Sequence, residues 1–177
     1  MNSVQLSDFS EDLDTISLCD VPRPKAEKGQ VVVKMLMAAV NPSDLNFIRG
    51  DYKTALSRLI WNHQTDPVCF DVSRKLPYPE PPYALGGEGV GVVVECGGGL
   101  LARRLKGKRV AVPAGPPNGA WQDFTVVDAK KAIPVPDAIS DEQAAMYIVN
   151  PLSAYAMVHE VLNVKKGGWL LQSAAMC

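Results

Sequence analysis

The fold of this chain is decided by the stretch Asn41-Pro42-Ser43-Asp44-Leu45-Asn46-Phe47-Ile48-Arg49-Gly50-Asp51-Tyr52. Residues 31–40, just before it, are rich in β-branched and long apolar side chains and therefore predict a buried strand. Pro42 cannot continue that strand, and Ser43 or Asp44 can cap a helix that runs up to the next glycine. That glycine suits a left-handed stop, so the pattern predicts a rigid strand-to-helix corner.

Two side chains flank this corner and carry its chemistry. Asn41 stands at the end of the strand, and Tyr52 follows the helix. We expect the corner to present both residues to one cleft. A tyrosine hydroxyl there can donate a hydrogen bond to a carbonyl oxygen or deliver a proton to a carbanion.

The composition excludes several classes of protein. Of the 177 residues, 47% are hydrophobic and 21% charged, which is typical of a globular protein, and the net charge is −1. That charge gives no support for binding nucleic acid or an anionic membrane, and no apolar run reaches the ~20 residues of a membrane helix. The four cysteines are widely spaced, which favours a reducing compartment. We expect a cytoplasmic protein, with the mitochondrion as the alternative if a presequence is missing.

The pattern along the chain divides it near residue 138. Short strands with turns about every ten residues predict a β-rich partial barrel over residues 1–138. Ser140-Asp141-Glu142-Gln143 is a capping box that opens a helix to about Val149, and Pro151 predicts the first position of a second helix, to about Leu162. Residues 169–173 read as a further strand. The expected strands cover residues 3–8, 15–20, 31–40, 88–96, 108–113, 121–127 and 132–135.

Four motifs in one order carry a family resemblance. After the corner come Leu85-Gly86-Gly87-Glu88-Gly89-Val90-Gly91-Val92-Val93, Gly119-Ala120-Trp121-Gln122-Asp123-Phe124 and Asn150-Pro151-Leu152-Ser153-Ala154-Tyr155. The chain resembles the medium-chain dehydrogenase/reductase superfamily, in its zinc-free quinone oxidoreductase and 2-enoyl thioester reductase branch. The resemblance implies a mixed α/β fold, with a chaperonin-10-like partial barrel over residues 1–138. The first helices and strand of a Rossmann NADP-binding domain would occupy residues 139–177.

The resemblance breaks at two places. The chain ends at Cys177, where the family continues with a glycine-rich phosphate turn, so we expect a truncated product that is inactive on its own. An insertion of roughly 20 residues, about 53–75, separates the tyrosine from the Pro-rich run at residues 76–83. Such an insertion favours a mobile loop, with a substrate lid as the alternative.

The resemblance also assigns roles to single residues. Tyr52 stands where the enoyl thioester reductases place their catalytic tyrosine, and the alternative is a tyrosine packed at a helix end. Asn41 would bind the nicotinamide end of NADPH, or else satisfy its own turn. Asn150 and Ser153 would meet the same end of the cofactor, with plain N-capping as their alternative.

Trp121 could wall the substrate pocket, although an aromatic residue in a strand is more often core. Tyr155 should point into the core. The superfamily's zinc-dependent alcohol dehydrogenases have a cysteine where Asn41 stands and a histidine where Gly87 stands, so we expect no metal.

The reaction implied is NADPH-dependent reduction of a conjugated C=C bond in a 2-enoyl thioester of CoA or acyl carrier protein, a step of fatty acid metabolism. Hydride would reach the β-carbon, with Tyr52 assisting the enolate. A quinone or reactive-aldehyde reductase is one alternative, and a truncated isoform that acts only by binding is another. Full-length relatives are expected to be homodimers.

Overall fold

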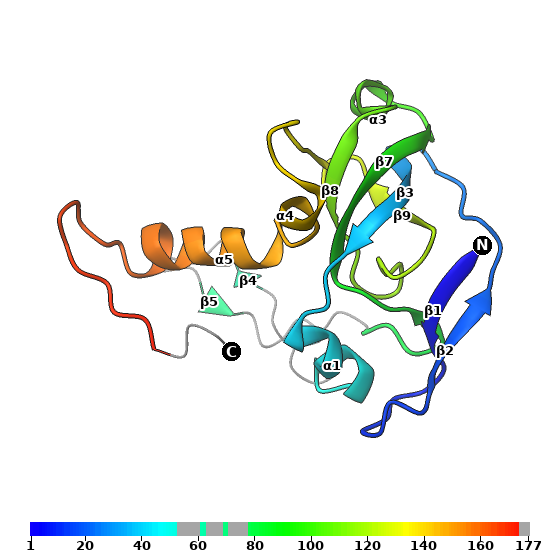
Figure 1. The fold of residues 1–177 in the computed structure, drawn as a ribbon, viewed down its shortest axis with the longest axis horizontal. Helices are drawn as coiled ribbons and strands as arrows, with labels where there is room; N and C mark the ends of the chain where they lie inside the picture. The colour runs from blue at the N-terminus through cyan, green and yellow to red at the C-terminus, as the bar shows by residue number, and fades with distance from the viewer. Residues whose placement is uncertain (53–60, 63–68, 71–77, 174–177) are drawn as a thin grey trace.

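The computed structural model describes residues 1–52, 61–62, 69–70 and 78–173, and it has the predicted mixed α/β fold. Two antiparallel sheets form the body of the molecule, and a helical arm projects from it (Figure 1). The described strands are β1 (Asn2–Leu6), β2 (Ile16–Asp20), β3 (Gln30–Ala38), β4 (Trp61–Asn62), β5 (Cys69–Phe70), β6 (Tyr83–Ala84), β7 (Glu88–Cys96), β8 (Arg109–Pro113), β9 (Phe124–Asp128) and β10 (Ile133–Pro134). The described helices are α1 (Pro42–Arg49), α3 (Leu100–Leu105), α4 (Asp141–Ala145), α5 (Val149–Ala156) and the π-helix η1 (Met157–Val161).

The larger sheet has the order β10-β8-β7-β3-β9. The strand predicted at residues 31–40 is β3, which pairs with β7 on one side and β9 on the other. Inward-facing valines from these strands form the main core together with the apolar side of α3. Its fully buried members include Val31, Val33, Val110 and Val112.

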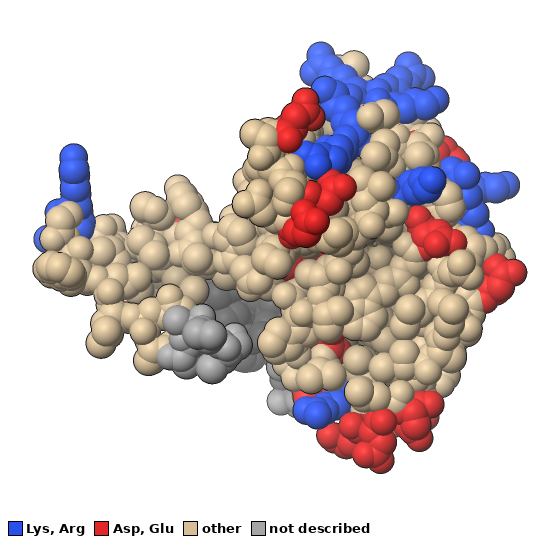
Figure 2. All heavy atoms as spheres, in the orientation of Figure 1, with Lys and Arg blue, Asp and Glu red and all other residues tan. Residues whose placement is uncertain are grey.

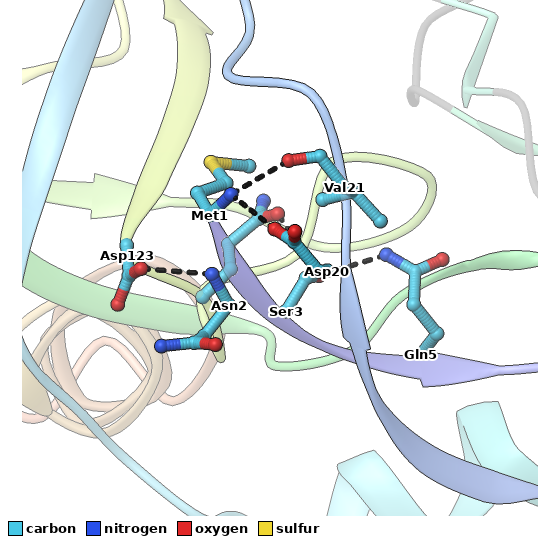
Figure 3. A network of polar contacts seen from close by, with 8 residues as sticks. Met1, Asn2, Ser3, Gln5, Asp20, Val21 and Asp123 are labelled. Carbon is cyan, nitrogen blue, oxygen red and sulfur yellow. Dashed lines mark hydrogen bonds and ion pairs between the residues drawn. The ribbon is translucent and has the colours of Figure 1, made fainter.

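The smaller sheet, in the order β2-β1-β6, contains the predicted N-terminal hairpin. The amino group of Met1 donates to the Asp20 carboxylate at 2.7 Å and to the carbonyl of Val21 at 2.8 Å (Figure 3). The backbone N–H of Asn2 donates to the Asp123 carboxylate at 2.8 Å. The Met1 contacts close the open end of the hairpin, and the Asn2 contact joins it to the segment that leads into β9.

The strand-to-helix corner is confirmed. Asn41 is the N-cap of α1, Pro42 is its first residue, and Gly50 ends the helix in the left-handed region with φ of 77°. The cap therefore lies before the proline and is not Ser43. Asp44 takes the reciprocal place in the capping box, because its carboxylate accepts the Asn41 backbone N–H at 2.7 Å.

The helices after the barrel follow the prediction only in part. The capping box of α4 is confirmed, with the Gln143 backbone N–H donating to the Ser140 hydroxyl, but the helix ends at Ala145. Arg109 of β8 holds this helix, since its guanidinium binds the Asp141 carboxylate at 2.6 Å and the carbonyls of Pro136 and Ile139. The short helix α3, which follows three glycines, was not predicted.

The C-terminal arm departs most from the prediction. Pro151 is the third residue of α5, not the first. Residues 169–173 form no strand, and Trp169 is 99% exposed. A parallel strand requires neighbours to accept its hydrogen bonds, and none of the described strands lies beside this segment. Tyr155, predicted to be core, is also exposed, and α5 buries none of its side chains.

The insertion is described only in two short pieces. Strands β4 and β5 pair antiparallel with each other. Residues 53–60, 63–68 and 71–77 lie outside the described residues, and so does the choice between a mobile loop and a substrate lid. Within the described ranges, no helix is long and apolar enough to cross a bilayer.

Charge is unevenly spread over the face drawn in Figure 2. Lysine and arginine side chains gather around α3, a group of acidic ones lies at the opposite end of the body with others in between, and much of the arm is uncharged. Helix α3 and the turn after it carry the exposed residues Arg103, Arg104, Lys106 and Lys108. No single sign covers this face.

Close backbone packing between β3 and β7 gives a first prediction. A Cβ atom at Gly91 would lie 2.3 Å from the Lys34 carbonyl oxygen and 2.6 Å from a Val33 methyl carbon. We expect Gly91→Ala to lower the free energy of unfolding by about 1–3 kcal/mol, measured by urea denaturation. Gly115→Ala, which meets open space, is the control and should change it by less than about 0.5 kcal/mol. Equal effects of the two substitutions would contradict this packing.

Candidate functional site

A buried carboxylate joins the barrel to the helical arm. Glu88, the first residue of β7, is 0% exposed. One of its oxygens accepts the side-chain amide of Asn41 at 3.0 Å. The other accepts the backbone N–H groups of Ile148 and Val149 at 2.9 Å each, at the N-terminus of α5. All three partners are donors, which suits an ionised carboxylate.

A second buried carboxylate lies on the other side of Asn41. Asp44 is 1% exposed and accepts the N–H of Asn41 at 2.7 Å and the N–H of Gly87 at 3.0 Å. Burial raises the pKa of Asp44 above its ordinary value, an effect that the two N–H donors oppose and that the nearby charge of Glu88 reinforces. The backbone and the side chain of Asn41 are thus held by different carboxylates.

Tyr52 lies at the far end of α1 from Asn41. The helix has eight residues and is therefore about 12 Å long. The phenol is half-buried, its ring meets Phe47 edge-on at 4.9 Å between centroids, and its oxygen accepts the Asn46 amide at 3.0 Å. Among the hydrogen bonds of the described residues, the hydroxyl only accepts, so within that part of the chain its own proton has no acceptor and can serve a ligand. The structure thus places Asn41 at the N-terminus of α1 and Tyr52 beyond its C-terminus.

Two further phenols surround this position, and the sequence analysis did not predict them. The Tyr78 hydroxyl is buried, and the Tyr83 hydroxyl is its polar neighbour. Burial raises the pKa of Tyr78 above its ordinary value of 10.0, with smaller contributions from Tyr83 and Tyr52. Tyr83 donates to the carbonyl of Phe47 at 3.1 Å. The Pro-rich run at residues 76–83 contains both tyrosines, and it is the sequence feature that could have indicated them.

Asn150 and Ser153 are exposed on the first turns of α5. The N-cap of this helix is Ile148, which has no capping side chain, so the alternative that these two polar residues serve as N-caps is wrong. Glu88, on another element, instead accepts the N–H groups of Ile148 and Val149, two donors that have no acceptor within the helix itself. Both polar side chains are therefore free of a capping role.

Trp121 lies between the two sheets. Its indole N–H donates to the Ala39 carbonyl at 2.9 Å, and its ring packs on a cluster that includes Leu6 and Leu85. These contacts suit the alternative role of Trp121 as a core residue, and its part in a substrate pocket stays a prediction. Nowhere in the described part of the chain do three or more His, Cys, Asp or Glu side chains form a group that could hold a metal ion.

Comparison with known proteins identifies this barrel. Residues 27–137 match the alcohol dehydrogenase GroES-like domain family. The chain belongs to that family, and with it to the medium-chain dehydrogenase/reductase superfamily.

Relatives of two kinds resemble this GroES-like chain. It is 32% identical over 147 residues to a mitochondrial enoyl-[acyl-carrier-protein] reductase of Bos taurus, covering 83% of this chain and 33% of the relative. Among solved structures, a putative NADPH:quinone reductase of Mesorhizobium loti is 28% identical with a TM-score of 0.67, covering 89% of this chain and 42% of that one. The quinone oxidoreductase of Thermus thermophilus, solved alone and with NADPH, is 25% identical with a TM-score of 0.61, covering 89% and 40%.

The chain spans less than half the length of the proteins it matches. A mitochondrial enoyl-[acyl-carrier-protein] reductase of Schizosaccharomyces pombe is matched over 98% of this chain but only 43% of its own length.

The raised pKa of Asp44 gives a prediction about pH. The folded state holds this proton more tightly than the unfolded chain, so the associated stability is present in acid and is lost as pH rises from 3.8 through the raised pKa. Asp44→Asn should lower the free energy of unfolding by about 1–3 kcal/mol, since one amide oxygen must serve two N–H groups. The difference in free energy of unfolding between the wild type and Asp44→Asn should be larger near pH 4 than at pH 7. Urea denaturation at both pH values measures it. A difference independent of pH would contradict the burial of this carboxyl.

Proposed function

We propose that the GroES-like chain is the catalytic half of an NADPH-dependent oxidoreductase that reduces a conjugated C=C bond, most readily in a 2-enoyl thioester. The observation that carries this is the Tyr52 hydroxyl, which accepts a bond from Asn46 and donates its own proton to none of the described residues. Matches to enoyl-[acyl-carrier-protein] reductases support the thioester of acyl carrier protein or CoA as the substrate class.

The residues present fit the nicotinamide end of NADPH. Asn41 offers a side-chain amide that its carboxylate neighbour holds in one place, and Asn150 and Ser153 offer exposed polar groups on α5. These three residues would bind and orient the cofactor. NADPH, when bound, supplies the hydride that the β-carbon of the substrate receives.

Tyr52 serves the other side of the reaction. After the β-carbon gains a hydride, negative charge moves to the thioester oxygen and the α-carbon. A hydrogen bond from the phenol to that oxygen stabilises this enolate, and the phenol proton can pass to the α-carbon. Asn46 holds the phenol oxygen while it does so.

A quinone acceptor is the second candidate, because the same hydrogen bond would stabilise a reduced quinone oxygen. Likeness to proteins described as quinone reductases supports it. Comparison of crotonyl-CoA with a naphthoquinone as acceptors distinguishes the two, and a reactive aldehyde belongs in the same comparison. A several-fold preference for the thioester is the expected result.

The setting of the protein is also a proposal. Enoyl reductase relatives are described as mitochondrial, which favours the mitochondrion over the cytoplasm expected at first. Homodimers are proposed for the full-length proteins. The proposed function requires no partner other than a small-molecule substrate.

The role of Tyr52 can be tested in a chimera that joins residues 1–173 to the remaining part of the Bos taurus relative. Loss of the phenol proton in Tyr52→Phe should lower kcat with crotonyl-CoA by about 10²-fold, with little change in KM for NADPH. Tyr155→Phe, on the exposed side of α5, is the matched control and should keep its activity. Unchanged kcat in Tyr52→Phe would exclude the proposed role.

The 177-residue chain by itself should bind NADPH only weakly. Its described residues supply the nicotinamide end of the site, whereas no described strand and glycine-rich turn is available for the pyrophosphate. Titration of NADPH followed by its fluorescence should show no saturation at micromolar concentrations. Tight binding would mean that the chain holds the cofactor in another way.

A further inference from the structure

Helix α5 is joined to the barrel through the N–H groups at its start. None of its residues is buried, and apolar side chains along it and η1 are exposed. Its N-cap residue, Ile148, supplies no side-chain acceptor. Both Ile148 and Val149 donate instead to one oxygen of Glu88, which is fully buried at the start of β7. The helix N-terminus carries partial positive charge, so an ionised carboxylate there is favourable.

The other oxygen of Glu88 holds the side chain of Asn41. A carboxylate can only accept, so it requires the NH₂ group of the Asn41 amide to face it. Asn41 is itself fixed at its backbone by Asp44. One carboxylate therefore connects a residue at the N-cap of α1 with the N-terminus of α5, two elements about 107 residues apart in the sequence.

We propose that Glu88 is a positioning residue that holds Asn41 and α5 as one unit, so that the cofactor-binding groups of the barrel and of the arm keep a fixed relative placement. This rests on the proposed function for the identity of the ligand, the nicotinamide end of a reduced dinucleotide. Glu88 itself does not touch that ligand. It acts through Asn41 on one side and through Asn150 and Ser153 on the other.

Two substitutions separate the two connections. Glu88→Gln retains one oxygen, which can still accept the N–H groups of Ile148 and Val149, but it turns an NH₂ group toward the NH₂ of Asn41. Glu88→Leu loses both connections. Glu95→Gln is the matched control on the same strand, because its side chain is 41% exposed and accepts the Ala26 N–H at the other end of β7.

The experiment is NMR on the 177-residue chain, with amide hydrogen exchange and the side-chain NH₂ resonances of Asn41 as readouts. In Glu88→Gln, the Asn41 resonances should move while protection of residues 149–156 stays within about threefold. In Glu88→Leu, that protection should fall by about tenfold or more while protection of β3 changes less. Glu95→Gln should leave both readouts as in the wild type. A purely global loss of stability would lower protection of β3 and α5 together and would overturn the proposal.

Titration with reduced nicotinamide mononucleotide then distinguishes the proposal from the function on which it rests. Chemical-shift changes at both Asn41 and Asn150 in the wild type would support the proposal if both are lost in Glu88→Leu. The same shifts persisting in Glu88→Leu overturn it while leaving the proposed function intact. If the wild type shows no chemical-shift changes, the nicotinamide end of the cofactor does not bind at this site, and the ligand named in the proposal is wrong. Should Glu88→Leu fail to fold, the wild type still decides, because solvent-like Asn41 NH₂ resonances or unprotected N–H groups at Ile148 and Val149 would overturn the proposal.

Discussion

A carboxylate removed from water must find its donors inside the protein, and the place where Glu88 finds them organises this structure. Its two oxygens bind an amide from the corner after β3 and two N–H groups that begin α5. An unpaired charge at this depth would be strongly unfavourable, so all three partners must be in place together. Strand β7, the corner before α1 and the start of α5 are therefore joined through one carboxylate, that of Glu88.

The chemistry of the candidate site follows from how α1 is held. Asp44 fixes its N-terminus to Gly87, and the left-handed Gly50 turns the chain so that Tyr52 folds back over the helix. The phenol is oriented by Asn46 of α1, six residues earlier in the chain, so its position depends on local geometry and not on a long side chain from elsewhere. Two more phenols, Tyr78 and Tyr83, come to this region from the Pro-rich connector.

Much of the fold could be predicted because its signals are local. The apolar run of β3, the proline and glycine that bound α1, and the capping box at Ser140 each act within a few residues. The wrong predictions have one cause: a local sequence pattern does not show which distant residues an element will contact. Residues 169–173 have the composition of a buried strand, yet Trp169 is solvent-exposed because no described strand pairs with them. Pro151 suggested a helix start, but the cap came from Glu88, 60 residues away from Ile148.

The sequence by itself determined the order of the elements, the strand-to-helix corner and the family of the chain, since periodicity, turn residues and motif order are properties of neighbouring residues. The tertiary structure decided what the polar residues do. The Glu88 carboxylate, which the sequence presents as one acid in a glycine-rich motif, becomes the junction of the site only when β7, α1 and α5 meet. Trp121, open to two roles in the sequence, acquires a carbonyl partner and apolar neighbours through the meeting of two sheets. Such roles depend on distances between residues far apart in the chain, and a linear pattern does not contain those distances.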